Sequence, residues 1–250
     1  MTPFDFVLIA CAIISTSFIS GLFGMAGGMI LVGVLLVYFD VATGMVIFSI
    51  IQFVANGWRA VLWWRFVLWR IFFVYVIGAV LAFAVMRYVA IIPSKAAVYL
   101  GLGILPFAIE LLPARARPNI EWRGVPFFTG VATTVIQLLT GVGGLFLDIF
   151  FQKSMLDRKT TLATKAVVQT ASHILRLVYF VSLTGFGTGL AALPVLAAIA
   201  LAVGGTMLAP YVIERMTDHS FRQWTRFVIY TICIVYLLRA AWLYWQYWQA

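Results

Sequence analysis

Apolar residues fill most of this chain in runs that are long enough to cross a membrane. Such runs lie at about 45–64, 70–89 and 95–112 in the first half, and at about 161–183, 189–211 and 227–248 in the second half. A hydrocarbon core of about 30 Å needs about 20 helical residues at about 1.5 Å each. The pattern therefore predicts three crossing helices in each half of the chain.

A run that is interrupted by glycines precedes each trio of helices, at about 4–39 and about 124–152. The piece after the first interruption, Met29–Phe39, is too short for an ordinary crossing. Such segments are typical of a re-entrant helical hairpin or of two half-helices that meet at an unwound turn, and both readings stay open. We predict an all-α integral membrane protein of two repeats, each a glycine-broken hairpin followed by three transmembrane helices.

Polar residues recur between the two halves at one spacing. The triplet Gln52, Asn56 and Arg59 reappears 117 positions later as Gln169, His173 and Arg176. A glycine cluster precedes each triplet, formed by Gly24, Gly27 and Gly28 in the first half and by Gly141, Gly143 and Gly144 in the second. The members of a triplet share one helix face, because they are spaced i, i+4 and i+7. Matched polar residues and glycine breaks in two membrane halves indicate a transport site.

The composition excludes a soluble domain. Hydrophobic residues make up 64% of the chain and charged residues only 10%, and the mean hydropathy is +1.06. The start of the chain has no basic segment, so we expect the first apolar run to remain in the protein and not to be a cleaved signal peptide. We divide the single membrane domain into repeat 1 (residues 1–112), a polar cytoplasmic linker (113–123) and repeat 2 (124–250).

The basic residues predict the orientation in the membrane. We assume that each glycine-broken hairpin ends on the side of the membrane where it began. Eleven loop arginines and lysines then fall on one side of the membrane, and two, Arg87 and Lys95, fall on the other. The positive-inside rule makes the first side cytoplasmic, so both termini are predicted outside, in a bacterial inner membrane, and the second repeat is inverted relative to the first. This bias also accounts for the net charge of +9, and we expect no nucleic-acid partner.

The matched residues suggest a pocket for a small anion. An arginine at membrane depth costs about 2.5–3.5 kcal/mol on insertion scales, so Arg59 and Arg176 are candidate site residues. The alternative is that both reach an interface. Glycines at the start of a half-helix leave backbone N–H groups free to bind an anion, although the same glycines also suit tight helix packing. Arginine favours forked oxyanions such as carboxylate, sulfonate or sulfite.

An acid and a histidine are candidates for coupling transport to protons. Asp148 follows the second glycine cluster, where the first half has an apolar residue, and it either carries a proton or pairs with Lys165 or Arg176. His173 is the alternative proton carrier, because histidine titrates near physiological pH. Lys165 is expected to reach the cytoplasmic interface.

The glycine-broken starts of both halves and the second-half motifs Thr140-Gly-Val-Gly-Gly144 and Thr161-Leu-Ala-Thr-Lys-Ala166 resemble the TauE/SafE family of sulfite exporters. The first copy, Gly24-Met-Ala-Gly27-Gly28, lacks the proline that family members carry after the glycines, and Asp148 falls within the second copy. The resemblance implies secondary transport, usually outward, of sulfite, a sulfonate or another small organic anion.

The first functional hypothesis is therefore a secondary anion exporter that works by alternating access, with its site at the midplane between the repeats. An anion-selective channel on the same scaffold is the alternative, followed by a membrane-embedded enzyme and a structural subunit. No catalytic residue, metal site or cofactor is predicted. The expected partners are the anion and the lipid bilayer, and the chain works either alone or as a homodimer.

Overall fold

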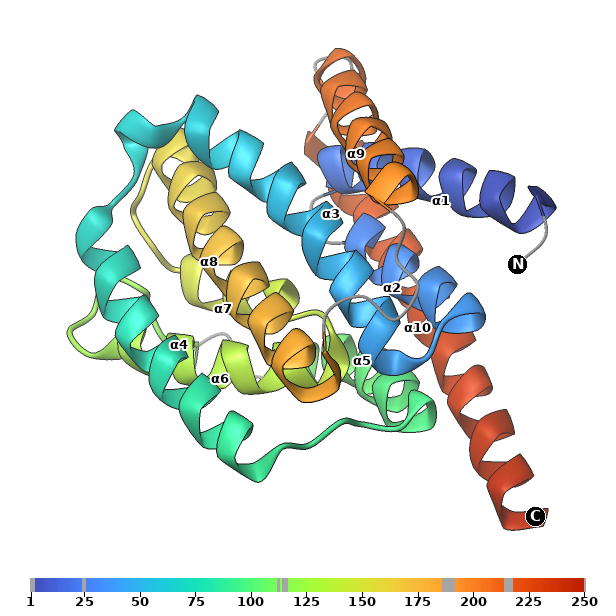
Figure 1. Cartoon of the computed structure of the whole chain (residues 1–250). Coiled ribbons are helices and arrows are strands. Elements are labelled where there is room, and N and C mark those ends of the chain that lie inside the picture. The colour runs from blue at the N-terminus through green and yellow to red at the C-terminus, as the bar shows by residue number, and fades with distance from the viewer. Residues whose placement is uncertain are drawn as a thin grey trace.

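The computed structural model of the chain is helical (Figure 1) and describes residues 3–23, 26–111, 113, 117–185, 192–213 and 218–249. The helices of the first half are α1 (Pro3–Phe23), α2 (Ala26–Tyr38), α3 (Val41–Leu62), the short 3₁₀ helix η1 (Trp64–Phe66), α4 (Trp69–Val89) and α5 (Lys95–Leu111). Those of the second half are α6 (Val125–Thr140), α7 (Gly144–Phe151), α8 (Arg158–Thr184), α9 (Ala192–Ile213) and α10 (Asp218–Gln249).

Five of the described helices are long and apolar enough to cross a membrane, namely Phe4–Leu22, Val41–Leu62, Trp69–Val89, Lys159–Thr184 and Arg226–Gln249. Four of them coincide with runs predicted to cross, and the fifth, α1, lies within the first glycine-broken segment. Helix α5 has 17 residues, and the apolar part of α9 runs over Leu193–Leu208. The molecule is therefore an all-helical, multi-pass membrane protein.

Two helices precede the remaining helices of each half, and the predicted division into a hairpin and three crossing helices stays a prediction. Helix α2 packs against α1, and α7 packs against α6. The second pair turns at Gly141, which ends α6 with a φ of 83°, a value that glycine adopts without strain. Gly24 lies outside the described residues, so the conformation of the first turn is not described.

Helices α3 and α8 begin in the same way, 117 positions apart. The carboxylate of Asp40 accepts a hydrogen bond from the backbone N–H of Thr43 at 3.0 Å, and Asp157 accepts one from the N–H of Thr160 at 3.0 Å. Such N-caps satisfy donors that have no partner within the helix. The caps fix the starts of the two helices that carry the polar triplets.

The helix contacts have the same arrangement in the two halves. Helix α3 packs on α8, α1 on α9, α4 on α6, and α5 on α10. If each helix of the first half is replaced by its counterpart in the second half (α1 by α6, α2 by α7, and so on) and the reverse, the same set of packed pairs results. The helix packing therefore follows the repeat seen in the sequence.

Helices α3 and α8 lie side by side and run in opposite directions (Figure 1). Three hydrogen-bonded pairs show the direction: Ser49 with Arg176, Asn56 with His173, and Leu68 with Thr164. As the residue number rises along α3 and into the turn after it, the number of the partner on α8 falls. The two triplets therefore face each other across this antiparallel pair.

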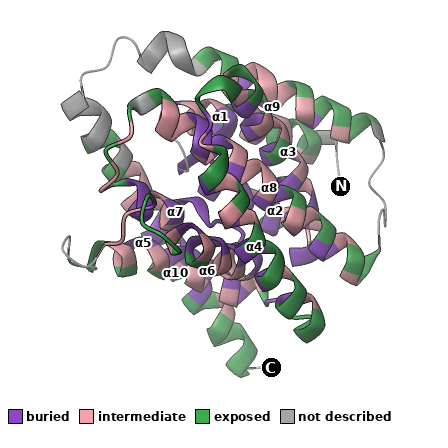
Figure 2. Ribbon diagram, turned by 90° about the vertical axis from the view of Figure 1, so that its left-hand side faces the viewer, coloured by how far each residue is buried: buried purple, intermediate pink, exposed green. Residues whose placement is uncertain are grey.

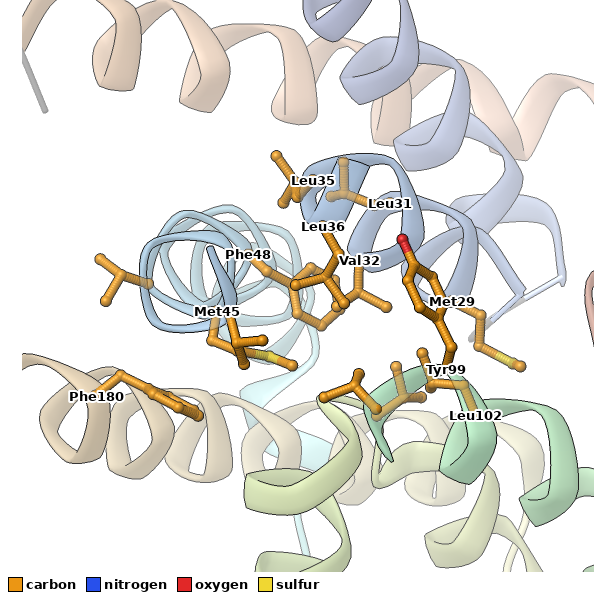
Figure 3. Close-up of a cluster of buried hydrophobic side chains, with 14 of the residues drawn as sticks. Met29, Leu31, Val32, Leu35, Leu36, Met45, Phe48, Tyr99, Leu102 and Phe180 are labelled. Atoms are coloured by element: carbon orange, nitrogen blue, oxygen red, sulfur yellow. The ribbon is translucent and has the colours of Figure 1, made fainter. Parts of the chain in front are cut away.

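Buried apolar side chains gather around α2 (Figure 3). The labelled residues come from α2, α3, α5 and α8, and include Met29, Met45, Tyr99 and Phe180. A smaller cluster joins α4 and α7, and Ile120 from the connection between the halves is buried in it. Exposed positions lie on the outward helix faces (Figure 2). Many are apolar, as on α4, where Ile77, Leu81 and Val85 are exposed, and such faces suit contact with lipid.

Candidate functional site

The antiparallel pair α3 and α8 forms one wall of a cavity, and the α6–α7 turn forms another. The cavity has a volume of about 80 Å³, which is room for a few water molecules or one compact ion. Its lining residues are Ser20, Gly28, Phe48, Gln52, Asn56, Arg59, Gln137, Gly141, Val142, Gly143, Gly144, Asp148, Leu162, Lys165, Gln169 and His173. Nine of the twelve predicted binding residues lie in this lining. Of the other three, Gly24 is outside the described residues, and Gly27 and Arg176 lie behind the cavity wall.

Some of the glycines serve tight helix packing, and others line the cavity. A Cβ atom on Gly27 would lie 2.0 Å from the backbone oxygen of Thr16, so Gly27 serves the packing of α2 on α1. A Cβ atom on Gly28 would lie 2.5 Å from Nε2 of Gln52, and Gly28 therefore keeps space open in the cavity. Gly143 does both, because it lines the cavity and packs closely on Thr133.

The helix starts at α2 and α7 provide backbone donors near this space. Gly28 is the third residue of α2, and Gly144 is the first residue of α7. The first N–H groups of a helix have no acceptor within the helix, and the helix dipole adds partial positive charge there. These ends are suited to anions.

Arg176 is fully buried, with 0% of its surface exposed, and its guanidinium contacts α3 and the α6–α7 turn. Its Nε donates to the hydroxyl of Ser49 at 2.8 Å, and one terminal nitrogen donates to the backbone oxygen of Gly141. Its guanidinium carbon lies 4.3 Å from the ring centre of Phe48, a cation–π contact. Arg176 therefore binds α8 to α3 and to the α6–α7 turn.

Arg59 is placed differently, although it is the equivalent of Arg176. Arg59 lines the cavity and is half-buried. No described residue accepts a hydrogen bond from its guanidinium or forms an ion pair with it. The sequence explains the difference, because the positions equivalent to Ser49 and Phe48 are Ala166 and Lys165. Neither alanine nor lysine can hold an arginine. The first-half arginine therefore lacks the contacts that hold Arg176 among the described residues.

His173 contacts a neighbouring cation. Its Nδ1 lies 3.1 Å from a terminal nitrogen of Arg176, and a guanidinium can only donate. Nε2 lies 3.3 Å from Nδ2 of Asn56, which is also a donor. A neutral ring has one acceptor nitrogen, so it accepts a hydrogen bond from Arg176 or from Asn56 but not from both. A doubly protonated ring would accept neither hydrogen bond, so these contacts belong to the neutral ring, and a role of His173 as proton carrier stays a prediction.

Asp148 pairs with Lys165 at the cavity. Lys165 is expected from the sequence to reach the cytoplasmic interface; in the structure its ammonium pairs with Asp148, and 21% of its side chain is exposed. The carboxylate on the neighbouring helix draws the ammonium inward instead. Oδ1 of Asp148 is buried and has no other hydrogen-bond donor among the described residues.

Sequence reasoning missed four polar or aromatic residues of the lining, Ser20, Phe48, Gln137 and Lys165. A usable signal was present, because Ser20 and Gln137 are themselves 117 positions apart. This matched pair lies outside the triplets and lines the same cavity.

The amino-acid sequence was compared with known protein families. The model of the family described as "Sulfite exporter TauE/SafE" matches residues 8–237, nearly the whole chain. The chain belongs to the sulfite exporter TauE/SafE family. Neither the curated proteins nor the solved structures gave a match. Membership in TauE/SafE makes this chain a membrane transporter, of a family that carries sulfite and related sulfur anions.

Proposed function

We propose that this TauE/SafE protein is a secondary transporter that exports a small sulfur-containing or organic anion, such as sulfite or a sulfonate, through the cavity between α3 and α8. The observation that carries the proposal is Arg59, a half-buried residue that lines the cavity and whose guanidinium has no partner among the described residues. A desolvated cation without a counterion is costly. An anion that binds beside Arg59 removes that cost.

The surroundings of Arg59 favour an oxyanion. The side-chain amides of Gln52, Gln137 and Gln169 line the same cavity, and each can donate two hydrogen bonds. The N–H groups of Gly28 and Gly144 add backbone donors. A planar guanidinium pairs with two oxygens of one group, which is the geometry of sulfonate, sulfite and carboxylate. The volume of about 80 Å³ suits a compact anion.

The antiparallel pair supports inverted repeats and alternating access. Helices α3 and α8 are equivalent in sequence and run in opposite directions, so an axis that relates them lies across the helices and hence in the membrane plane. Transporters built this way bind substrate between the repeats and open to each side in turn. The bias of basic loop residues supports cytoplasmic placement of the 113–123 linker and external termini, in a bacterial inner membrane.

An anion-selective channel on this scaffold is the second candidate. The small cavity volume favours a carrier, because a channel needs a continuous path. A homodimer stays a prediction, as does a monomeric carrier.

The test is anion flux into proteoliposomes. Wild-type protein should give saturable uptake of sulfite or methanesulfonate, and Arg59→Gln should abolish it. Arg65→Gln is the matched control, since Arg65 is exposed beyond the end of α3 and lies outside the cavity. Equal flux in Arg59→Gln and wild type would refute the proposed site, and a large single-channel conductance would favour the channel.

A further inference from the structure

Among the described residues, two cations and one carboxylate line the cavity, which leaves one positive charge without a counterion. The cations are Arg59 on α3 and Lys165 on α8, and the carboxylate is Asp148 on α7. Asp148 is paired with Lys165. His173 is held neutral by its contact with Arg176, whose own charge is bound to Gly141, Ser49 and Phe48 behind the wall. The lining therefore has a net charge of +1.

The repeat places Lys165 beside the anion site. Lys165 is the equivalent of Phe48, 117 positions earlier, and Phe48 is the residue whose ring contacts the guanidinium of Arg176. Arg59 is the equivalent of Arg176. By this correspondence we expect Lys165 to lie opposite Arg59, and both residues line the cavity. An oxyanion bound to Arg59 is then within the surroundings of the lysine ammonium.

We propose that Lys165 is the second cationic contact of the transported anion. Asp148 forms an ion pair with this lysine, and the pair keeps the anion from Lys165 until the carboxylate binds a proton. The inference rests on the proposed anion site at Arg59. A proton from solvent binds the carboxylate of Asp148 and breaks its ion pair, and the anion then takes the place of the carboxylate at Lys165. One proton and one singly charged anion enter together, so the site keeps its charge of +1.

The surroundings of Asp148 leave few other groups for this role. Helix α6, which packs on α7, has no titratable side chain. Helix α5 also packs on α7, but Glu110 is paired with Arg226 and the hydroxyl of Tyr99 donates to Gly33; Lys95 begins that helix. The inward titratable groups of α8 are Lys165, His173, Arg176 and Tyr179, whose hydroxyl donates to the backbone oxygen of Ile91. Lys159 lies over the ring of Phe66 at the start of α8. The described contacts make Lys165 the group that responds when Asp148 is neutralised.

The experiment is equilibrium binding of methanesulfonate to purified protein between about pH 5 and about pH 8, by calorimetry in buffers that differ in ionisation enthalpy. This probe stays a monoanion throughout, so only the protein changes charge. Over this range wild-type affinity should fall as pH rises, by up to about tenfold per pH unit, because one proton is taken up with each anion. Asp148→Asn should bind tightly at every pH without proton uptake. Lys165→Gln should bind weakly and without pH dependence.

The outcomes separate this inference from the proposed function. If binding is lost in Arg59→Gln but wild-type affinity is the same at all pH values, the anion site stands and the proton linkage is wrong. If Asp148→Asn keeps the wild-type pH dependence, Asp148 is not the proton carrier. If wild type binds nothing at any pH, or Arg59→Gln binds normally, both proposals fail. His173→Gln is the control and should keep the wild-type proton uptake.

Discussion

Asn56 and His173 lie against each other, with Nδ2 of the first 3.3 Å from Nε2 of the second, although they are 117 positions apart. That spacing is also the repeat of the chain, so each is the counterpart of the other. A two-fold relation between the halves would bring counterparts together in this way, and that relation stays a prediction. The cavity lies at this contact, and residues of both halves line it.

Replacing the two matched arginines should have different effects. Arg176→Gln removes a buried group and leaves the oxygen of Gly141 without its donor, so we expect a loss of stability of about 1–3 kcal/mol. Arg59→Gln removes a side chain without protein partners and should melt close to wild type while losing anion binding. Thermal melting in detergent with and without methanesulfonate measures both. Equal destabilisation by the two variants would contradict the assignment.

Two neighbouring glycines should also differ. Gly27→Ala places a Cβ atom 2.0 Å from the backbone oxygen of Thr16, which cannot move without shifting α1, so the variant should be strongly destabilised. Gly28→Ala meets the end of the Gln52 side chain at 2.5 Å, which can rotate away into the cavity. Gly28→Ala should fold and lose anion affinity by about tenfold. Melting temperature and binding, measured on both variants, check the difference.

The start of α8 gives a prediction for pH dependence. The hydrogen bonds that Asp157 accepts from the hydroxyl and then the N–H of Thr160 lower its pKa below the usual 3.8. A lowered folded-state pKa contributes stability that is present above the unfolded value and is lost as pH falls through the folded value. Asp157→Asn should therefore melt slightly below wild type at neutral pH and approach it in acid, below about pH 3.8. A gap that widens in acid would contradict this origin.

Mutation of the histidine should change binding without changing its pH dependence. His173→Gln keeps a donor beside Asn56 and removes the acceptor for Arg176. We expect a several-fold loss of anion affinity, because Arg176 positions the α6–α7 turn, and an unchanged pH profile of transport. Flux measured from about pH 5 to about pH 8 tests this. A flattened profile would assign the proton to His173 instead.

The sequence predicted the helices and most of the cavity for an understandable reason. Apolar runs in lipid have few alternatives to helix, and a matched spacing of polar residues picks out the faces that meet. The positions of Gln52, Asn56, Gln169 and His173 in the lining follow from that spacing alone. The family assignment is confirmed. The inverted orientation, the external termini and the domain boundaries stay predictions.

The different roles of Arg59 and Arg176 did not follow from the triplets, because the triplets are nearly identical. The difference arises at neighbours outside them, where Ser49 and Phe48 hold one arginine while Ala166 and Lys165 cannot hold the other. The inward direction of Lys165 was also missed. Helical periodicity gives the face on which a lysine lies, but the carboxylate that draws it is on another helix.

The unequal support of the two arginines has a consequence for the resting protein. If transport exchanges the conformations of the repeats, Arg59 must enter the surroundings that Arg176 now has, and it finds an alanine and a lysine in place of the serine and the phenylalanine. The two end states then differ in free energy even without substrate, and about 1.4 kcal/mol already gives a tenfold excess of one state. The empty carrier would rest facing one side of the membrane, ready for anions from that side.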